Sequence, residues 1–222
     1  MTIMLPGILP PGVLEALLLI VLIGALLLVV RGVRRRHAFA RVEADAELPD
    51  LETAQRITAT VRRVYRDAEQ GVWMADVSLG RKRLTLCAVD FAAKAEAWRG
   101  LVTREADIAL YALSSLAPGG VEAMRDQIKD YDKVKITPDL VRLVPVPDAE
   151  SPNDFAVIAR TLSHRTDAAS GIPVDVYRAE VIRSQELNLI LELAVPKVPG
   201  TTPYPDGSMV HGSARLYGYL PG

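Results

Sequence analysis

At residues 187–195 the chain reads LNLILELAV. Leucine occupies every second position from 187 to 193, and Val195 continues the pattern. Because side chains of a β-strand alternate between two faces, this period of two predicts a strand with one continuous buried face. Such a face is typical of the central strand of a sheet, so we expect a β-rich domain around it.

The same period of two recurs on both sides of this stretch. Residues 57–61, 73–79 and 84–89 are joined by short connections, which predicts an antiparallel meander. Residues 155–162 fit either a strand or a helix. Further strands are expected at residues 107–113, 140–146, 174–182 and 210–220.

Two short helices are expected between the strands. Asp90 can cap a helix that runs from Phe91 to Arg99. Pro118 precedes a second helix, in which apolar residues from Val121 to Tyr131 recur at helical spacing.

Residues 147–153, PDAESPN, are the best candidate for an internal boundary. They divide the domain into two β-rich subdomains, residues 55–147 and 154–222. The strand number and short turns suit a small open barrel of the oligonucleotide-binding-fold type, but an irregular antiparallel sheet backed by helices fits equally well. A faint similarity between residues 59–79 and 179–195 suggests a duplicated module.

The N-terminal part contains one long apolar stretch. Residues 13–30 read VLEALLLIVLIGALLLVV, with Glu15 as the single charge. A helix of about 20 residues spans roughly 30 Å, the thickness of a bilayer core. The alternatives are a buried core helix or a signal peptide, but a signal peptide is basic before its apolar stretch and this chain is basic after it. The predicted fold class is therefore a single transmembrane helix followed by an α+β, mostly antiparallel β domain.

The flanks of this stretch predict its orientation. Residues 1–12 contain no Lys or Arg, and basic residues remain on the cytoplasmic side of a membrane. We expect an extracytoplasmic N-terminus, a single pass through the inner plasma membrane and a cytoplasmic C-terminal domain. The arginines that set this topology are Arg31, Arg34, Arg35 and Arg36.

Residues 31–54 form a predicted juxtamembrane stalk with a basic start and an acidic end. Residues 43–52 contain five acids and no base, and an anionic membrane surface would repel them. A plain solvated linker fits equally well.

Charge and cysteine content exclude several function classes. The chain of 222 residues has 26 basic and 27 acidic residues, of which residues 37–222 hold 22 and 26. This acidic balance argues against binding a nucleic-acid backbone. A single cysteine, Cys87, excludes an intrachain disulfide and a cysteine-built zinc site.

Few residues suggest catalysis. Ser163, His164 and Asp167 are the residue types of a hydrolytic triad, but neighbouring side chains on a strand point to opposite faces. His37 and His211 stand apart from other candidates. Asp130, Asp132 and Asp139 lack the glycine and final glutamate of a calcium loop. We therefore predict no catalytic residue, no metal and no cofactor.

Two surface features suggest contacts with other molecules. Tyrosine and arginine are enriched at protein interfaces, so the C-terminal set of Tyr204, Arg215, Tyr217 and Tyr219 is a candidate docking surface. The alternative is that these tyrosines pack internally. The turn at Arg81, Lys82 and Arg83 can either contact lipid headgroups or simply keep the turn soluble.

These observations favour a membrane-anchored, non-enzymatic accessory, assembly or scaffolding protein that binds protein partners or further copies of itself. Two alternatives remain open. One is a membrane-tethered, hydrolase-like enzyme that uses His164, and the other is a sensor of a small ligand.

Overall fold

The structure, a computed structural model, describes residues 54–221 except 124–136, 138, 148 and 170–171. Nine strands and one helix occur in these residues. In chain order they are β1 (Gln55–Arg66), β2 (Trp73–Leu79), β3 (Lys82–Ala88), α2 (Phe91–Gly100), β4 (Glu105–Pro118), β5 (Arg142–Pro145), β6 (Asp154–Ala169), β7 (Ile172–Arg183), β8 (Asn188–Pro196) and β9 (Met209–Tyr219).

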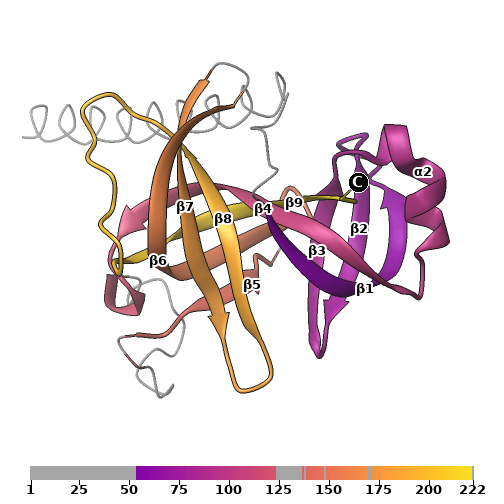
Figure 1. Cartoon of the computed structure of the whole chain (residues 1–222), viewed down its shortest axis with the longest axis horizontal. Coiled ribbons are helices and arrows are strands. Elements are labelled where there is room, and N and C mark those ends of the chain that lie inside the picture. The colour runs from indigo at the N-terminus through magenta and orange to yellow at the C-terminus, as the bar shows by residue number, and fades with distance from the viewer. Residues whose placement is uncertain (1–53, 124–136, 138, 148, 170–171, 222) are drawn as a thin grey trace, which may run out of the picture. The chain divides into compact units, whose positions relative to one another are not determined.

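Strands β4 and β9 form a long antiparallel ribbon through the middle of the sheet (Figure 1). One edge of β4 pairs first with β1, at residues 105–110, and then with β8, at residues 111–113. The outer edge of β9 pairs with β6 at residues 209–215 and with β3 at residues 217–218. Each edge of the ribbon therefore serves two different strands.

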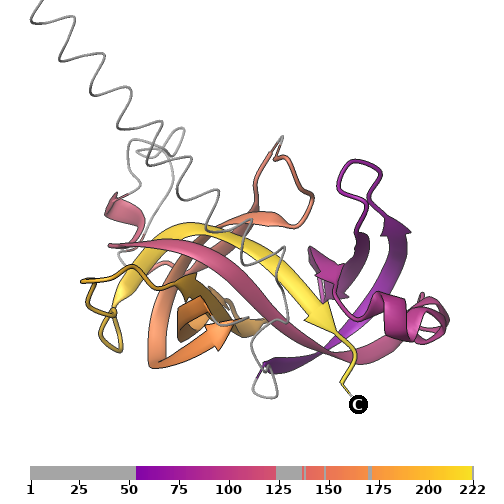
Figure 2. The same cartoon turned by 90° about the horizontal axis from the view of Figure 1, so that it is seen from above.

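Two closed rings of strands result from these pairings. The meander β1-β2-β3 runs from the edge of β4 to the edge of β9 and closes the first ring. The meander β6-β7-β8 closes the second ring on the other half of the same ribbon. Figure 2 shows the ribbon passing from one ring into the other. Each ring has five strands, as in the small Greek-key barrels of the oligonucleotide-binding type.

Apolar side chains fill the two rings as one continuous core. Leu86, Leu110 and Leu216 are fully buried in the first ring, and Phe155 and Leu191 are buried in the second. Burying one such side chain contributes about 1.5–3 kcal/mol, so the alternating apolar residues stabilise both rings.

Two glycines allow β9 to lie close against β4. A Cβ atom at Gly212 would stand 1.9 Å from the carbonyl oxygen of Ser115. At Gly218 the added atom would stand 3.1 Å from side-chain carbons of Ile108 and Leu86. The ribbon therefore requires glycine at position 212.

The strand predictions are largely confirmed. Residues 188–195 of this stretch fall in β8, which lies inside the sheet between β4 and β7. The meander of β1, β2 and β3 is antiparallel as expected. Residues 155–162, which fitted two structures, belong to strand β6. Pro145 ends β5, which forms the edge of the sheet.

The helix predictions need two corrections. Helix α2 occupies the expected residues, but the Asp90 side chain makes no capping bond. It accepts hydrogen bonds from Trp98 Nε1 at 2.7 Å and from the backbone N–H of Leu220 at 3.0 Å, and so ties the helix to the C-terminal residues. The predicted second helix does not begin at Pro118, because β4 extends to that residue and only a 3₁₀ turn follows at 121–123. Residues 124–131 lie outside the described residues.

Two residues of the segment PDAESPN bind to β9 and to the loop between β1 and β2. Asn153 is buried, and its Nδ2 donates to the backbone oxygen of Leu216 at 2.7 Å. Ser151, also buried, donates from Oγ to Gln70 Oε1 at 3.2 Å. Both rings share β4 and β9, and the division into two subdomains, residues 55–147 and 154–222, stays a prediction.

The predicted membrane-spanning architecture is also corrected. Residues 13–30 lie outside the described residues. Within the described part of the chain, no helix has the length and apolar character needed to cross a bilayer. Helix α2 has 10 residues and so spans only about 15 Å. The structure shows a mostly β domain with one helix, and the predicted fold class and single-pass inner-membrane localisation are not supported.

Candidate functional site

A hollow lies at the boundary where β1 and β8 meet on β4. Gln55 of β1 pairs with Leu110, and Glu192 of β8 pairs with the next residue, Tyr111. Strand β1 runs antiparallel to β4 whereas β8 runs parallel to it, so the two strands diverge from this point. The space between them, which we call the seam hollow, has a volume of about 320 Å³. It is lined by Ala54, Gln55, Arg56, Arg178 and Glu192.

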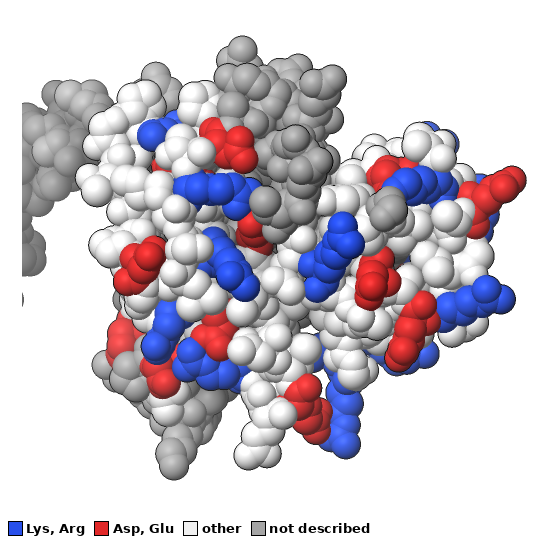
Figure 3. Space-filling model, in the orientation of Figure 1, with Lys and Arg blue, Asp and Glu red and all other residues white. Residues whose placement is uncertain are grey.

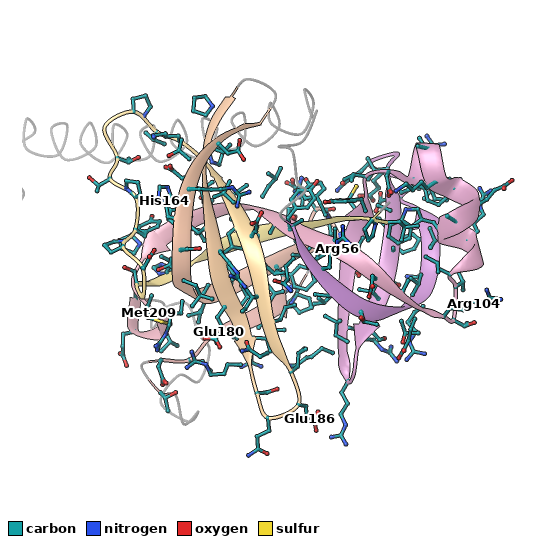
Figure 4. All side chains as sticks on the ribbon, viewed as in Figure 1. Arg56, Arg104, His164, Glu180, Glu186 and Met209 are labelled. Carbon is teal, nitrogen blue, oxygen red and sulfur yellow. The ribbon has the colours of Figure 1, made fainter. Side chains whose placement is uncertain are left out.

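Three strands supply the charged side chains of the seam hollow. Arg56 comes from β1, Arg178 from β7 and Glu192 from β8, and the two arginines are exposed. Arg178 and Glu192 are direct cross-strand neighbours. Figure 4 labels Arg56 near the beginning of β1, and Figure 3 shows basic side chains on both sides of the boundary between the rings.

The Glu192 carboxylate is engaged by another arginine. Glu192 is only 5% exposed, and Arg165 of β6 donates to both of its oxygens, at 2.7 and 3.0 Å. The pKa of Arg165 is raised above its usual value, and the hydrogen bond to Glu192 is the largest cause. Arg165 Nε also lies 3.6 Å from a carboxylate oxygen of Asp167. The charge of Glu192 is therefore offset mainly by Arg165.

Arg56 and Arg178 supply the positive charge of the seam hollow. Within the described residues, neither guanidinium has an ion-pair partner or a side-chain hydrogen bond. Guanidinium groups present paired N–H donors that match the two oxygens of a carboxylate or phosphate. The seam hollow can therefore bind an anionic group.

His164, the histidine considered for catalysis in the sequence analysis, lies beside a carboxylate that the sequence did not indicate. His164 Nε2 lies 3.0 Å from Asp175 Oδ1, and Asp175 is 5% exposed. His164 pairs in register with Tyr177 whereas Ser163 pairs with Arg178, which places Ser163 and His164 on opposite faces. The structure thus does not bring Ser163, His164 and Asp167 together as a triad. Asp175 was missed because its proximity depends on strand register.

The tyrosines of the predicted docking surface mostly contact other residues of the same domain. Tyr217 is 7% exposed and stacks on Tyr111 with ring centroids 5.5 Å apart. Tyr204 donates from its hydroxyl to the backbone oxygen of Leu116 at 2.9 Å. Tyr219 is partly exposed.

Arg215, the fourth member of this predicted docking surface, donates to Asp154 at 2.6 and 3.1 Å. The docking role of all four residues stays a prediction.

The other candidates are dispersed. Arg81 lies 3.4 Å from Glu186 between two exposed turns, and the exposed Lys82 and Arg83 begin β3. His211 Nδ1 lies 3.1 Å from the backbone oxygen of Gly119. The candidates outside the described residues are Arg31, Arg34, Arg35, Arg36, His37, Asp130 and Asp132.

Asp139 is exposed and lies 3.8 Å from Arg183 NH1. In the described ranges, no group of three His, Cys, Asp or Glu side chains is placed to hold a metal ion. The headgroup contacts of Arg81, Lys82 and Arg83 and the absence of a metal and a cofactor stay predictions.

No family model matches this chain, and neither a curated protein nor a solved structure is significantly similar to it. Function is therefore inferred from the residues of the site.

Proposed function

We propose that this domain is a non-enzymatic binding module that recognises an acidic segment of a partner protein at the seam hollow. One observation carries the proposal. Arg56 and Arg178 come from different strands and line the same hollow, and no described carboxylate forms an ion pair with either. A carboxylate from a partner would accept hydrogen bonds from both guanidiniums.

The lining of the hollow favours a peptide over a free small molecule. Small-molecule sites usually have volumes of about 300–1,000 Å³ and mostly apolar walls. The seam hollow is at the lower end of that range, and among the described residues that line it Ala54 alone is apolar. A small molecule would bury little apolar surface here, whereas a peptide can insert one acidic side chain and gain further contacts on the neighbouring strands.

The expected affinity is modest. An exposed ion pair contributes about 0.2–1 kcal/mol, and a shielded charge-assisted hydrogen bond contributes about 1.5–3 kcal/mol. The free energy that each arginine contributes in a partly enclosed hollow should lie between these two limits. A segment with several acids is therefore needed for binding in the range of about 10–500 μM.

Fluorescence anisotropy with a labelled peptide of alternating Glu and Ala residues tests the proposal at low salt. We expect Arg56→Gln and Arg178→Gln each to weaken binding about three- to tenfold. Arg104 is exposed at a different part of the first ring, as Figure 4 shows, so Arg104→Gln is the matched control and should bind as the original chain does.

Two results would contradict the proposal. In the first, the two hollow variants bind the peptide as tightly as the original chain. In the second, Arg104→Gln weakens binding as much as they do, which would indicate a general charge effect. Circular dichroism should confirm that all three variants are folded.

A further inference from the structure

We infer that residues 45–52 of this chain are themselves a ligand of the seam hollow and compete there with a partner's acidic segment. The inference rests on the proposed function. These residues read DAELPDLE and contain four carboxylates and no basic side chain. Their charge complements the two arginines, Arg56 and Arg178, that lack a described ion-pair partner.

The pairing of β1 determines where this segment joins the domain. Gln55 pairs with Leu110 on the edge of β4, and the next position on that edge, Tyr111, already pairs with Glu192. The edge of β4 beyond Leu110 is therefore occupied by β8. Ala54, the residue before Gln55, is 6% exposed and lines the seam hollow.

The distance along the chain is short. Glu52 precedes Ala54 by two residues and Asp45 precedes it by nine. An extended chain advances about 3.3–3.6 Å per residue, so all four acids lie within roughly 32 Å of the rim of the hollow. No long connection has to be ordered before one of these carboxylates reaches Arg56 or Arg178.

Tethering makes the competition effective despite weak contacts. A short connection holds a ligand at an effective concentration on the order of 1 mM. If the same segment binds as a free peptide with a Kd of about 0.25 mM, the tethered copy occupies most of the hollows. An added peptide then binds with an apparent affinity that is about fivefold lower. A partner would therefore need more acids or additional contacts to displace it.

The test uses the full chain and a labelled free peptide with the sequence of residues 45–52. One variant neutralises the segment with Asp45→Asn, Glu47→Gln, Asp50→Asn and Glu52→Gln. A control variant makes the same change in net charge at exposed acids elsewhere, with Glu69→Gln, Glu96→Gln, Glu105→Gln and Asp206→Asn.

We expect the segment variant to bind the free peptide about fivefold more tightly than the original chain, and the control variant to gain less than twofold. Adding Arg56→Gln and Arg178→Gln should remove the gain. Equal binding by the segment variant and the original chain, or an equal gain in the control, would overturn this inference.

The same measurements separate this inference from the proposed function. If the segment variant shows no gain but the peptide still requires Arg56 and Arg178, the proposed function stands and the inference fails. If the peptide binds none of the chains, both fail.

Discussion

Substituting Gly212 with alanine should strongly destabilise the domain. The added Cβ would stand 1.9 Å from the carbonyl oxygen of Ser115, so β9 and β4 must separate by about 1 Å to reach a contact of about 3 Å. Hydrogen bonds between the strands are about 2.9 Å long and do not survive such a displacement. Losing one or two buried backbone bonds and the nearby packing should cost about 3–5 kcal/mol.

Urea unfolding followed by circular dichroism measures this cost, and two other glycines calibrate it. Gly218→Ala meets side-chain carbons at 3.1 Å and should cost about 1–2 kcal/mol. Gly100→Ala has no atom within 4 Å and should change stability by less than about 0.5 kcal/mol. A cost at Gly212 below about 1 kcal/mol would refute the close approach of β9 to β4.

Three further substitutions test other parts of the structure. Asn153→Ala leaves the Leu216 carbonyl without its buried donor, and urea unfolding should show a loss of about 1–3 kcal/mol. Tyr111→Phe removes a buried hydroxyl without a partner in the described structure and should change stability at pH 7 by less than about 1 kcal/mol. Burial holds the pKa of Tyr111 well above its usual value of about 10. The free energy of unfolding should therefore fall as pH rises above about 10, because the tyrosine ionises there only in the unfolded chain. Tyr111→Phe should reduce that fall when unfolding is measured at a series of alkaline pH values. Glu192→Gln removes the negative charge beside Arg178, so anisotropy should show about two- to fivefold tighter binding of the acidic peptide, whereas unchanged or weaker binding would contradict the assigned charges.

The strands could be predicted from the sequence because their signal is local. The alternation in LNLILELAV reports one buried face, and β8 has that face. Ring closure could not be predicted in the same way, since β4 meets β8 between residues about 80 positions apart and β3 meets β9 across about 130. Nothing in a period of two specifies which distant edge a strand will join.

The same limit applies to the functional residues. Tyr217 was predicted to belong to a docking surface, but it is 7% exposed and stacks on Tyr111. Arg56 and Arg178 are unremarkable in sequence, being single polar residues on amphipathic strands. They become a candidate site because β1 and β8 meet at adjacent positions of β4.

The apolar length of residues 13–30 and the arginines after them supported a membrane topology, yet the described part of the chain contains no helix long and apolar enough to cross a bilayer. Hydropathy describes a segment by itself and carries no information about the strand pairings that form the rest of the chain. The mostly β character, in contrast, followed from patterns repeated over many separate segments.

Arginine side-chain NMR during a titration with the acidic peptide tests the central claim most directly. The Nε–Hε signals of Arg56 and Arg178 should shift together and saturate at the same peptide concentration, while the signal of Arg104 should stay in place. If Arg104 shifts as far as the other two, or if neither Arg56 nor Arg178 responds, the seam hollow is not the binding site.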